Sequence, residues 1–150
     1  MEQLFNSLSE KLINSLQNGE HLKVSIDGEL SQFIRFSQSK VRQSGLVDDA
    51  SISITLIYDE RSCSGSFTLG SNDHTNEKKA FTELKRLRKE VVTLPKDPFI
   101  VMPEDKGSSR EEHLGNLLPE ESTVDALSPA MQSVDLAGIW ASGRIFTGNA

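Results

Sequence analysis

The sequence has few cysteines and few large aromatic side chains: one Cys, one Trp and one Tyr occur among its 150 residues. A single cysteine, Cys63, cannot form an internal disulfide, so we expect a cytoplasmic protein. No run of about 18 apolar residues occurs, which argues against a membrane-spanning helix. The first residues, MEQLFNSLSEK, are polar and acidic early, unlike a secretory signal.

Basic residues are also in deficit, with 16 Lys and Arg against 22 Asp and Glu and a formal net charge of −6. This balance argues against general nucleic-acid affinity, because phosphate binding needs a basic face. In one stretch, 73–90, basic residues outnumber acidic residues by six to four. Such a stretch usually forms the solvent-exposed face of a helix. The alternative interpretation is a docking site for an acidic partner.

Alternation of apolar and polar residues organises the chain between His21 and Leu69. A period of two that is kept through short segments predicts a half-exposed antiparallel sheet. We expect a tight turn at Gln38-Ser39, a break or a bulge at Asp27-Gly28, and polar breaks in the strands at Asp48-Asp49 and Asp59-Glu60. The strands bounded in this way are 22–26, 30–37, 40–46, 50–58 and 61–69.

Apolar residues at steps of three and four predict one helix over 2–17 and another over 73–90, the second capped by Asn72 or Asp73. A third helix should start at Ser122 or Thr123, and Pro129 should kink or shorten it. The spacing of Ser109 and Glu112 suits a capping box, so a short helix there is also open.

These patterns predict an α+β fold: an antiparallel β-sheet meander covered by an N-terminal helix and a second amphipathic helix, with a C-terminal β-hairpin turning at Ser142-Gly143. We expect a sheet domain over 1–102 and a flexible loop over 103–122. Residues 123–150 would form the helix and hairpin, in the same domain or at the start of a following lobe. Because the last residues fall inside a predicted strand, we expect a fragment of a longer protein.

Groups that carry chemistry are sparse. No His or Cys lies roughly three to five residues from any histidine, so we expect no metal site in this chain alone. Cys63 alternates with serines and should be a small core group. Serines on the strands and adjacent acidic pairs are expected to be solvated, and no phosphate-binding loop motif occurs. The histidines are His21, His74 and His113, and the acidic pairs are Asp48-Asp49, Glu111-Glu112 and Glu120-Glu121.

Two stretches together resemble the amino-terminal domain of the TldD/PmbA proteins. The first is QFIRFSQSKVRQSG at 32–45, followed by a strand, an acidic turn, a strand and a helix. The second is DLAGIWASGRIFTGNA at 135–150, which is similar to a glycine-rich hairpin in that family. The resemblance covers nearly the whole chain, although its motifs are strand patterns and small residues rather than ligands.

The TldD/PmbA resemblance implies a soluble two-domain zinc metalloprotease, known as a modulator of DNA gyrase, that matures or degrades small peptides. Members look like homodimers or pairs of paralogous subunits. The family's zinc-binding HExxxH helix belongs to its carboxy-terminal domain and has no match here. No catalytic, metal or cofactor residue is therefore carried over, and zinc is implied only for the missing domain.

Two functional hypotheses follow. In the first, the chain is the non-catalytic amino-terminal domain of such a peptidase and contributes to the substrate chamber and the subunit interface, with Phe33, Arg35 and Trp140 as candidate contact residues. Its partners would be its own carboxy-terminal domain, a second subunit and a peptide, but no membrane. In the second, a stand-alone module uses the basic helix at 73–90 to dock an acidic protein or nucleic acid.

Overall fold

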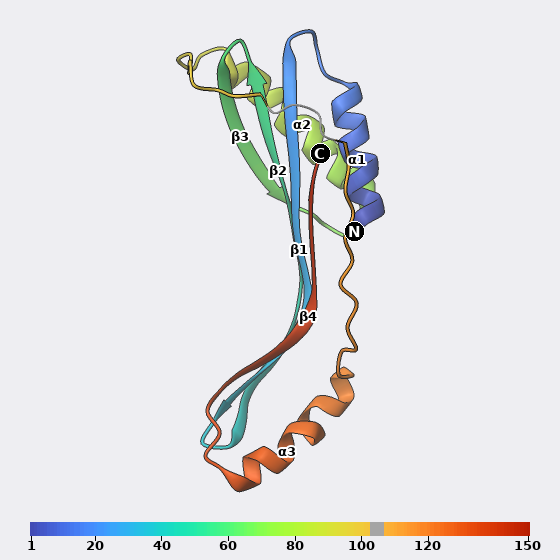
Figure 1. The fold of residues 1–150 in the computed structure, drawn as a ribbon, viewed down its shortest axis with the longest axis vertical. Helices are drawn as coiled ribbons and strands as arrows, with labels where there is room; N and C mark the ends of the chain where they lie inside the picture. The colour runs from blue at the N-terminus through green and yellow to red at the C-terminus, as the bar shows by residue number, and fades with distance from the viewer. Residues whose placement is uncertain (103–106) are drawn as a thin grey trace. The chain divides into compact units, whose positions relative to one another are not determined.

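The computed structural model describes residues 1–102 and 107–150. Its elements confirm the α+β class (Figure 1). In chain order they are α1 (Glu2–Asn14), β1 (Glu20–Ser37), β2 (Lys40–Tyr58), β3 (Arg61–Thr68), α2 (Asp73–Val91), a 3-10 turn (Glu120–Ser122), α3 (Thr123–Ser133) and β4 (Gly138–Asn149).

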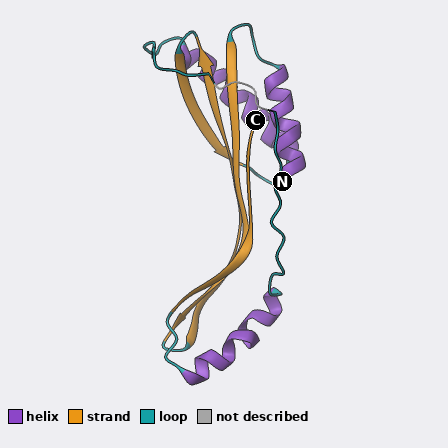
Figure 2. Ribbon diagram, viewed as in Figure 1, coloured by secondary structure: helices purple, strands orange, loops and turns teal. Residues whose placement is uncertain are grey.

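The four strands form one sheet in the order β3-β2-β1-β4, drawn in orange in Figure 2. Two-residue turns join the first three strands. Gln38 and Ser39 both have φ of 52°, and Asp59 and Glu60 have φ of 49° and 59°. Left-handed conformations at both central residues suit the twist of a tight hairpin, even without glycine. The predicted turns at these two positions are confirmed.

The breaks predicted at Asp27-Gly28 and Asp48-Asp49 are wrong, because β1 and β2 each run unbroken through them. Gly28 is buried within β1, and the side chain of Met1 occupies the space where its Cβ would lie. The glycine therefore admits a close neighbour within a continuous strand. Asp48 and Asp49 are exposed, so they stay hydrated without ending the strand.

The predicted C-terminal hairpin is also wrong, because Gly138–Asn149 is the single strand β4. Gly143, expected in the turn, lies against the backbone of β1: a Cβ built on it would be 2.5 Å from both the carbonyl oxygen of Leu30 and the Cα of Ser31. Glycine at this position provides a close approach between strands.

Between the sheet and α3, the described residues 107–119 have no regular secondary structure, so the short helix considered from Ser109 does not form. Residues 103–106 of the predicted loop lie outside the described residues. The third helix is confirmed, and Pro129 does not shorten it, since α3 continues to Ser133. In the part of the chain that the structure describes, no helix is long and apolar enough to cross a membrane.

The chain divides into two compact units. The first comprises Met1–Gly28, Phe146–Ala150 and the described residues of Asp49–Asp105. Its core lies between the sheet and the two helices α1 and α2. Phe5, Leu8 and Leu12 of the predicted stripe of α1 are buried there, whereas Ile13 is 42% exposed. The buried core residues are Phe5, Leu8, Leu12, Val24, Ile26, Ile52, Ile54, Leu56, Cys63, Ala80, Leu84, Leu87 and Val91.

The second unit comprises Glu29–Asp48 and the described residues of Lys106–Ile145. Hydrogen bonds tie its segments to the β1–β2 turn. The Ser39 hydroxyl donates to the carbonyl oxygen of Val134 at 2.7 Å and accepts from the backbone N–H of Leu136 at 2.9 Å. On the strand itself, the Gln32 amide donates to the carbonyl oxygen of Leu118 at 3.2 Å.

Candidate contact surface

Within the second unit, β1 presents two different faces. Ile34 and Phe36 are only 5% and 4% exposed, whereas Arg35 is exposed and Phe33 is half-buried. Successive side chains of a strand point to opposite faces of the sheet. Phe33 and Arg35 therefore share one face, and Ile34 and Phe36 share the other. The two candidate residues of β1 are therefore brought together.

The pairing of β4 with β1 fixes which β4 side chains share that face. In the first unit, Val24 and Ala150 exchange both backbone hydrogen bonds at 2.8 Å, which defines an antiparallel register. In the second unit, Gly143 lies against Ser31 in that same register. Residues at odd positions of β4 therefore share a face with residues at odd positions of β1.

Continuing this register from Ser31 and Gly143 places Arg35 opposite Ile139, and Glu29 opposite Ile145. Ile139 is 61% exposed and Ile145 is 80% exposed. We call Phe33, Arg35, Ile139 and Ile145 together the open face of the second unit. It offers one aromatic ring, one guanidinium group and two aliphatic side chains, a combination that suits contact with a partly apolar partner.

The ring of Phe33 lies over Gly45 of β2. A Cβ built on Gly45 would be 2.7 Å and 2.9 Å from two atoms of this ring. The missing side chain at Gly45 therefore leaves the space that the ring occupies, and this packing explains why Phe33 is half-buried rather than exposed.

Trp140 lies on the other face of β4, the one shared with Ile34 and Phe36, and is half-buried. The structure therefore separates it from Phe33 and Arg35. Ile145 was missed in the sequence because a turn was predicted at Ser142-Gly143. Read as one unbroken strand, the sequence would have placed Ile145 on the same face as Ile139.

The two end strands of the sheet differ in the protection of their outer edges. Leu69 donates its backbone N–H to the carbonyl oxygen of Ala50 at 2.8 Å. In the β2–β3 register this pairing turns the carbonyl groups of Ser64 and Thr68 outward. Side chains of α2 donate to both: Lys79 Nζ to Thr68 at 2.9 Å and Arg86 Nη2 to Ser64 at 3.4 Å. The helix thus shields part of the β3 edge.

The outer edge of β4 is open in the described chain. Because Val24 and Ala150 form a hydrogen-bonded pair, alternation directs the backbone groups of the odd-numbered β4 residues away from β1. All of these residues are exposed. They are Ile139, Ala141, Gly143, Ile145, Thr147 and Asn149. Such an edge can pair with another strand.

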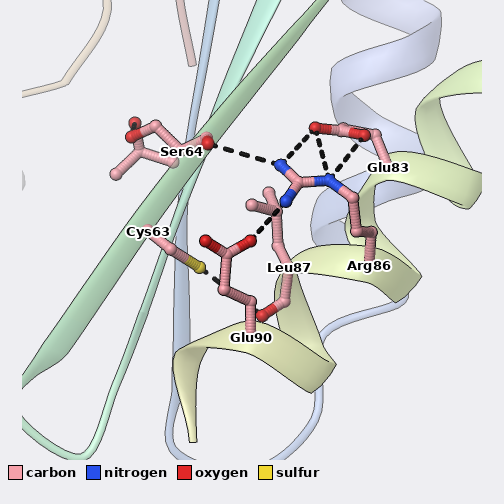
Figure 3. A network of polar contacts seen from close by, with 7 residues as sticks. Cys63, Ser64, Glu83, Arg86, Leu87 and Glu90 are labelled. Atoms are coloured by element: carbon pink, nitrogen blue, oxygen red, sulfur yellow. Dashed lines mark hydrogen bonds and ion pairs between the residues drawn. The ribbon is translucent and has the colours of Figure 1, made fainter. Parts of the chain in front are cut away.

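The basic helix α2 uses much of its charge within the protein (Figure 3). Arg86 Nη2 lies 2.7 Å from Glu83 Oε1, and Arg86 also pairs with Glu90. The hydrogen bond to Glu83 raises the pKa of Arg86. On the other side of the helix, Arg88 lies 2.7 Å from Glu20 Oε2, which lowers the pKa of the Glu20 carboxyl. The two pairs of Arg86 lie within α2, whereas the pair of Arg88 with Glu20 joins α2 to β1.

Cys63 lies beside this cluster and is 8% exposed, which confirms the predicted core position (Figure 3). Its Sγ donates to the carbonyl oxygen of Leu87 at 3.4 Å. Burial raises the pKa of the thiol, and the carboxylate of Glu90 adds to this effect. Both favour the protonated form, whereas a nucleophilic cysteine needs a lowered pKa.

Among the described residues, no group of three or more His, Cys, Asp or Glu side chains is placed to hold a metal ion. His113 Nε2 lies 3.6 Å from Glu111 Oε2, but both side chains are highly exposed. The described residues therefore do not supply a donor set for the zinc that the family resemblance implies.

No family model and no curated protein matches this sequence. Solved structures with a similar fold include two from thermophilic organisms. TldE from Thermococcus kodakarensis has a TM-score of 0.60 at 15% identity, and the match covers 99% of this chain and 37% of that one. A putative modulator of a DNA gyrase from Thermotoga maritima has a TM-score of 0.52 at 12% identity, covering 99% of this chain and 38% of the other. The resemblance predicted from the sequence is thus confirmed at the level of the fold.

Proposed function

We propose that this chain is the amino-terminal domain of a TldD/PmbA-like metalloprotease, and that it contributes to the substrate chamber and the subunit interface rather than to the catalytic groups. One observation carries the proposal: the match to TldE covers 99% of this chain but only 37% of TldE. The chain therefore has the fold of one part of a larger protein. Its single cysteine supports a cytoplasmic location.

The open face supports a role as a wall of a peptide chamber. Ile139 and Ile145 are exposed aliphatic side chains, and Arg35 places a positive charge opposite Ile139, whereas Glu29 lies opposite Ile145. Side chains of a bound peptide would gain from burial of apolar area, and an acidic group on the peptide would gain from Arg35. A zinc ion, held by residues outside this chain, would polarise the peptide carbonyl group during hydrolysis.

The exposed edge of β4 supports a role in subunit contact. Its outward backbone groups can pair with a strand of another chain, whereas Lys79 and Arg86 shield part of the opposite edge of the sheet. The chamber wall and the subunit contact would then use separate parts of the second unit: side chains on a face, and backbone groups at an edge.

The alternative, docking of an acidic protein or nucleic acid by the basic helix, has less support. Arg86 and Arg88 are held by carboxylates of the same chain, and Lys79 donates to the backbone of β3. Half of the six basic side chains of α2 therefore already have partners. A partner would have to bind mainly through Lys78, Lys85 and Lys89.

Sequencing the gene beyond the codon for Ala150 tests whether the chain continues into a catalytic domain. A reading frame that continues into a helix with an HExxxH motif is expected. Titration of a dye-labelled, unstructured apolar peptide with the 150-residue chain, followed by the fluorescence anisotropy of the label, then tests for contact. Arg35→Ala should weaken binding of an acidic peptide about tenfold, a loss of about 1.4 kcal/mol. Arg144→Ala, at an exposed arginine on the opposite face of the second unit, is the matched control. A stop codon directly after Ala150 would overturn the proposal.

A further inference from the structure

We propose that the outer edge of β3 and the groove beside it bind an extended peptide segment, with an acidic residue two positions before a large apolar residue. The site lies in the first unit and shares no residue with the open face, so it does not depend on the peptidase role proposed above. β3 is an end strand, since the sheet has the order β3-β2-β1-β4. Among the described strands, only β2 pairs with it.

Ser66 has both of its backbone groups directed away from β2. The hydrogen bond from Leu69 to Ala50 fixes the pattern of the β2–β3 ladder, in which Gly65 and Phe67 bond to β2 and Ser66 points outward. Within the described chain, no hydrogen bond reaches the N–H or the C=O of Ser66. A peptide residue can therefore exchange two backbone hydrogen bonds with Ser66, as in strand addition to a sheet edge.

Two cations of α2 limit how far such pairing can extend. Lys79 Nζ donates to the carbonyl oxygen of Thr68 at 2.9 Å. Arg86 Nη2 donates to the carbonyl oxygen of Ser64 at 3.4 Å (Figure 3). Both carbonyl groups are thus occupied, and the one between them, at Ser66, is not. Strand addition is therefore confined to a short stretch centred on Ser66.

A groove of about 330 Å³ lies beside this stretch, between β3 and α2. If a peptide residue pairs with Ser66, both of its neighbours in the peptide point to the face that α2 covers. One neighbour then lies opposite Phe67 and enters the groove. The volume is at the small end of the range for ligand pockets and suits one large apolar side chain. The residues that line the groove are Phe67, Thr75, Lys78, Lys79, Thr82 and Glu83.

The other neighbour of the paired peptide residue would lie opposite Gly65, where the groove is closed. A Cβ built on Gly65 would collide with the carboxylate of Glu83. This carboxylate accepts a hydrogen bond from Arg86 Nη2 at 2.7 Å, so its charge is balanced within the chain. The peptide therefore needs a small residue at this position, and Glu83 adds little repulsion to an acidic peptide.

Unbalanced positive charge lies at the Thr68 end of the groove. Lys78 and Lys79 line the groove, and neither forms an ion pair with any carboxylate that the structure describes. In the common antiparallel arrangement, the peptide begins at this end, and the residue two positions before the apolar one points to the α2 side. An acidic side chain there would be attracted by both lysines.

Fluorescence anisotropy with a labelled peptide tests the proposal. The probe is fluorescein-labelled Thr-Asp-Thr-Leu-Thr-Ser-Thr, titrated with the 150-residue chain. The control probe carries an N-methyl group on the threonine that follows leucine, which removes the N–H that would donate to Ser66. It should bind at least about tenfold more weakly, because one backbone hydrogen bond is lost and the carbonyl of Ser66 is covered without a partner.

Two variants of α2 test the groove itself. Thr82→Trp should fill it and weaken binding of the unmethylated peptide at least about tenfold. His74→Trp is the matched control, because His74 is exposed on the same helix but does not line the groove. Lys78→Met should weaken binding about threefold to fivefold, the range of one exposed charge pair. Lys85→Met, outside the groove, is its control.

Amide exchange locates the bound peptide. The N–H of Ser66 should become protected when the peptide binds, whereas that of Phe67, already bonded to β2, should change little. Arg35→Ala, on the open face, should leave the affinity for this peptide unchanged. A loss of affinity in Arg35→Ala equal to that in Thr82→Trp would overturn the assignment to the first unit.

Four further results would overturn the proposal: no binding up to about 1 mM peptide, no protection of Ser66 at saturation, equal affinity for the methylated peptide, or equal affinity of Thr82→Trp and the wild-type chain. The longer product of the reading frame gives one more test. A Ser66 amide that is protected there without peptide would also overturn it, because the protein's own residues would then cover the edge.

Discussion

Gly143 of β4 lies against Ser31 of β1 so closely that a Cβ atom on the glycine would be 2.5 Å from the Cα of Ser31. The neighbouring atoms include backbone, which cannot move aside as the end of a flexible side chain can. This close approach joins two strands far apart in the sequence, and it places Ile139 and Ile145 on the open face.

Gly143→Ala should therefore destabilise the protein by about 1 to 3 kcal/mol, the range typical of overpacking. Gly115→Ala is the matched control, because a Cβ at Gly115 meets no atom within 4 Å. Urea denaturation of both variants measures the difference. Equal midpoints for Gly143→Ala and the wild-type protein would contradict the close approach described here.

Asn76 holds the segment between β3 and α2. It is fully buried, its amide nitrogen donates to the carbonyl oxygen of Gly70 at 2.8 Å, and its Oδ1 accepts from the N–H of Gly70 at 2.8 Å. Asn76→Ala leaves these backbone groups without their partner, so the free energy of unfolding should fall by about 1 to 3 kcal/mol. Amide exchange at Gly70 should accelerate in this variant. Unchanged protection there would show that Asn76 does not hold the segment.

The ion pair between Glu20 and Arg88 should make stability depend on pH. The hydrogen bond from Arg88 lowers the pKa of Glu20 below its ordinary value of 4.5. A carboxyl group with a lowered pKa in the folded state stabilises the protein above its ordinary pKa, and this contribution is lost as the pH falls through the lowered pKa. Glu20→Gln should thus destabilise the protein at pH 7.

The difference in stability between the wild-type protein and Glu20→Gln should shrink when the pH is lowered from about 5 towards 3. Arg88→Met should abolish most of the same pH dependence, and the double variant should add little to either single change. Thermal denaturation at several pH values measures this. A difference that stays constant from pH 7 to 3 would mean that the pair contributes no proton linkage.

Lys79 and Arg86 shield the outward carbonyl groups of β3, and their removal should expose that edge. The double variant Lys79→Met and Arg86→Met should self-associate more readily in light scattering, because an open edge can pair with other chains. Lys85→Met with Lys89→Met is the control, since it removes the same charge from exposed positions of α2. Equal association of the two double variants would assign the effect to charge alone.

The sequence predicted what depends on neighbouring residues. The two-residue turns at Gln38-Ser39 and Asp59-Glu60 and the cap at Asn72 follow from local pattern and are confirmed. The apolar stripes of α1 and α2 are confirmed in part, since Ile13 is 42% exposed. Asn72 Oδ1 accepts from the Thr75 N–H at 2.9 Å, as a cap should.

The predictions about Gly28 and Gly143 were wrong because the roles of these residues depend on contacts between segments far apart in the sequence. Glycine is typical both of turns and of close strand contacts, and only the position of Ser31 shows that Gly143 serves the second role. The predicted turn at Ser142-Gly143 in turn hid the alternation of Ile139 with Ile145. The prediction at Gly28 was wrong for the same reason, since only the packing of Met1 against it shows why β1 has a glycine there. The sequence thus predicted two residues of the open face correctly, Phe33 and Arg35. The third candidate residue, Trp140, lies on the other face.

Peptide hydrolysis is the measurement that tests the central claim most directly. It compares the 150-residue chain with the product of the longer reading frame, each with added zinc and with a chelator. We predict that the longer product cleaves an unstructured peptide, that the chelator abolishes cleavage, and that the 150-residue chain cleaves nothing under either condition. Zinc-dependent cleavage by the 150-residue chain alone would contradict the account, because it would place the catalytic groups among residues assigned here to a supporting framework.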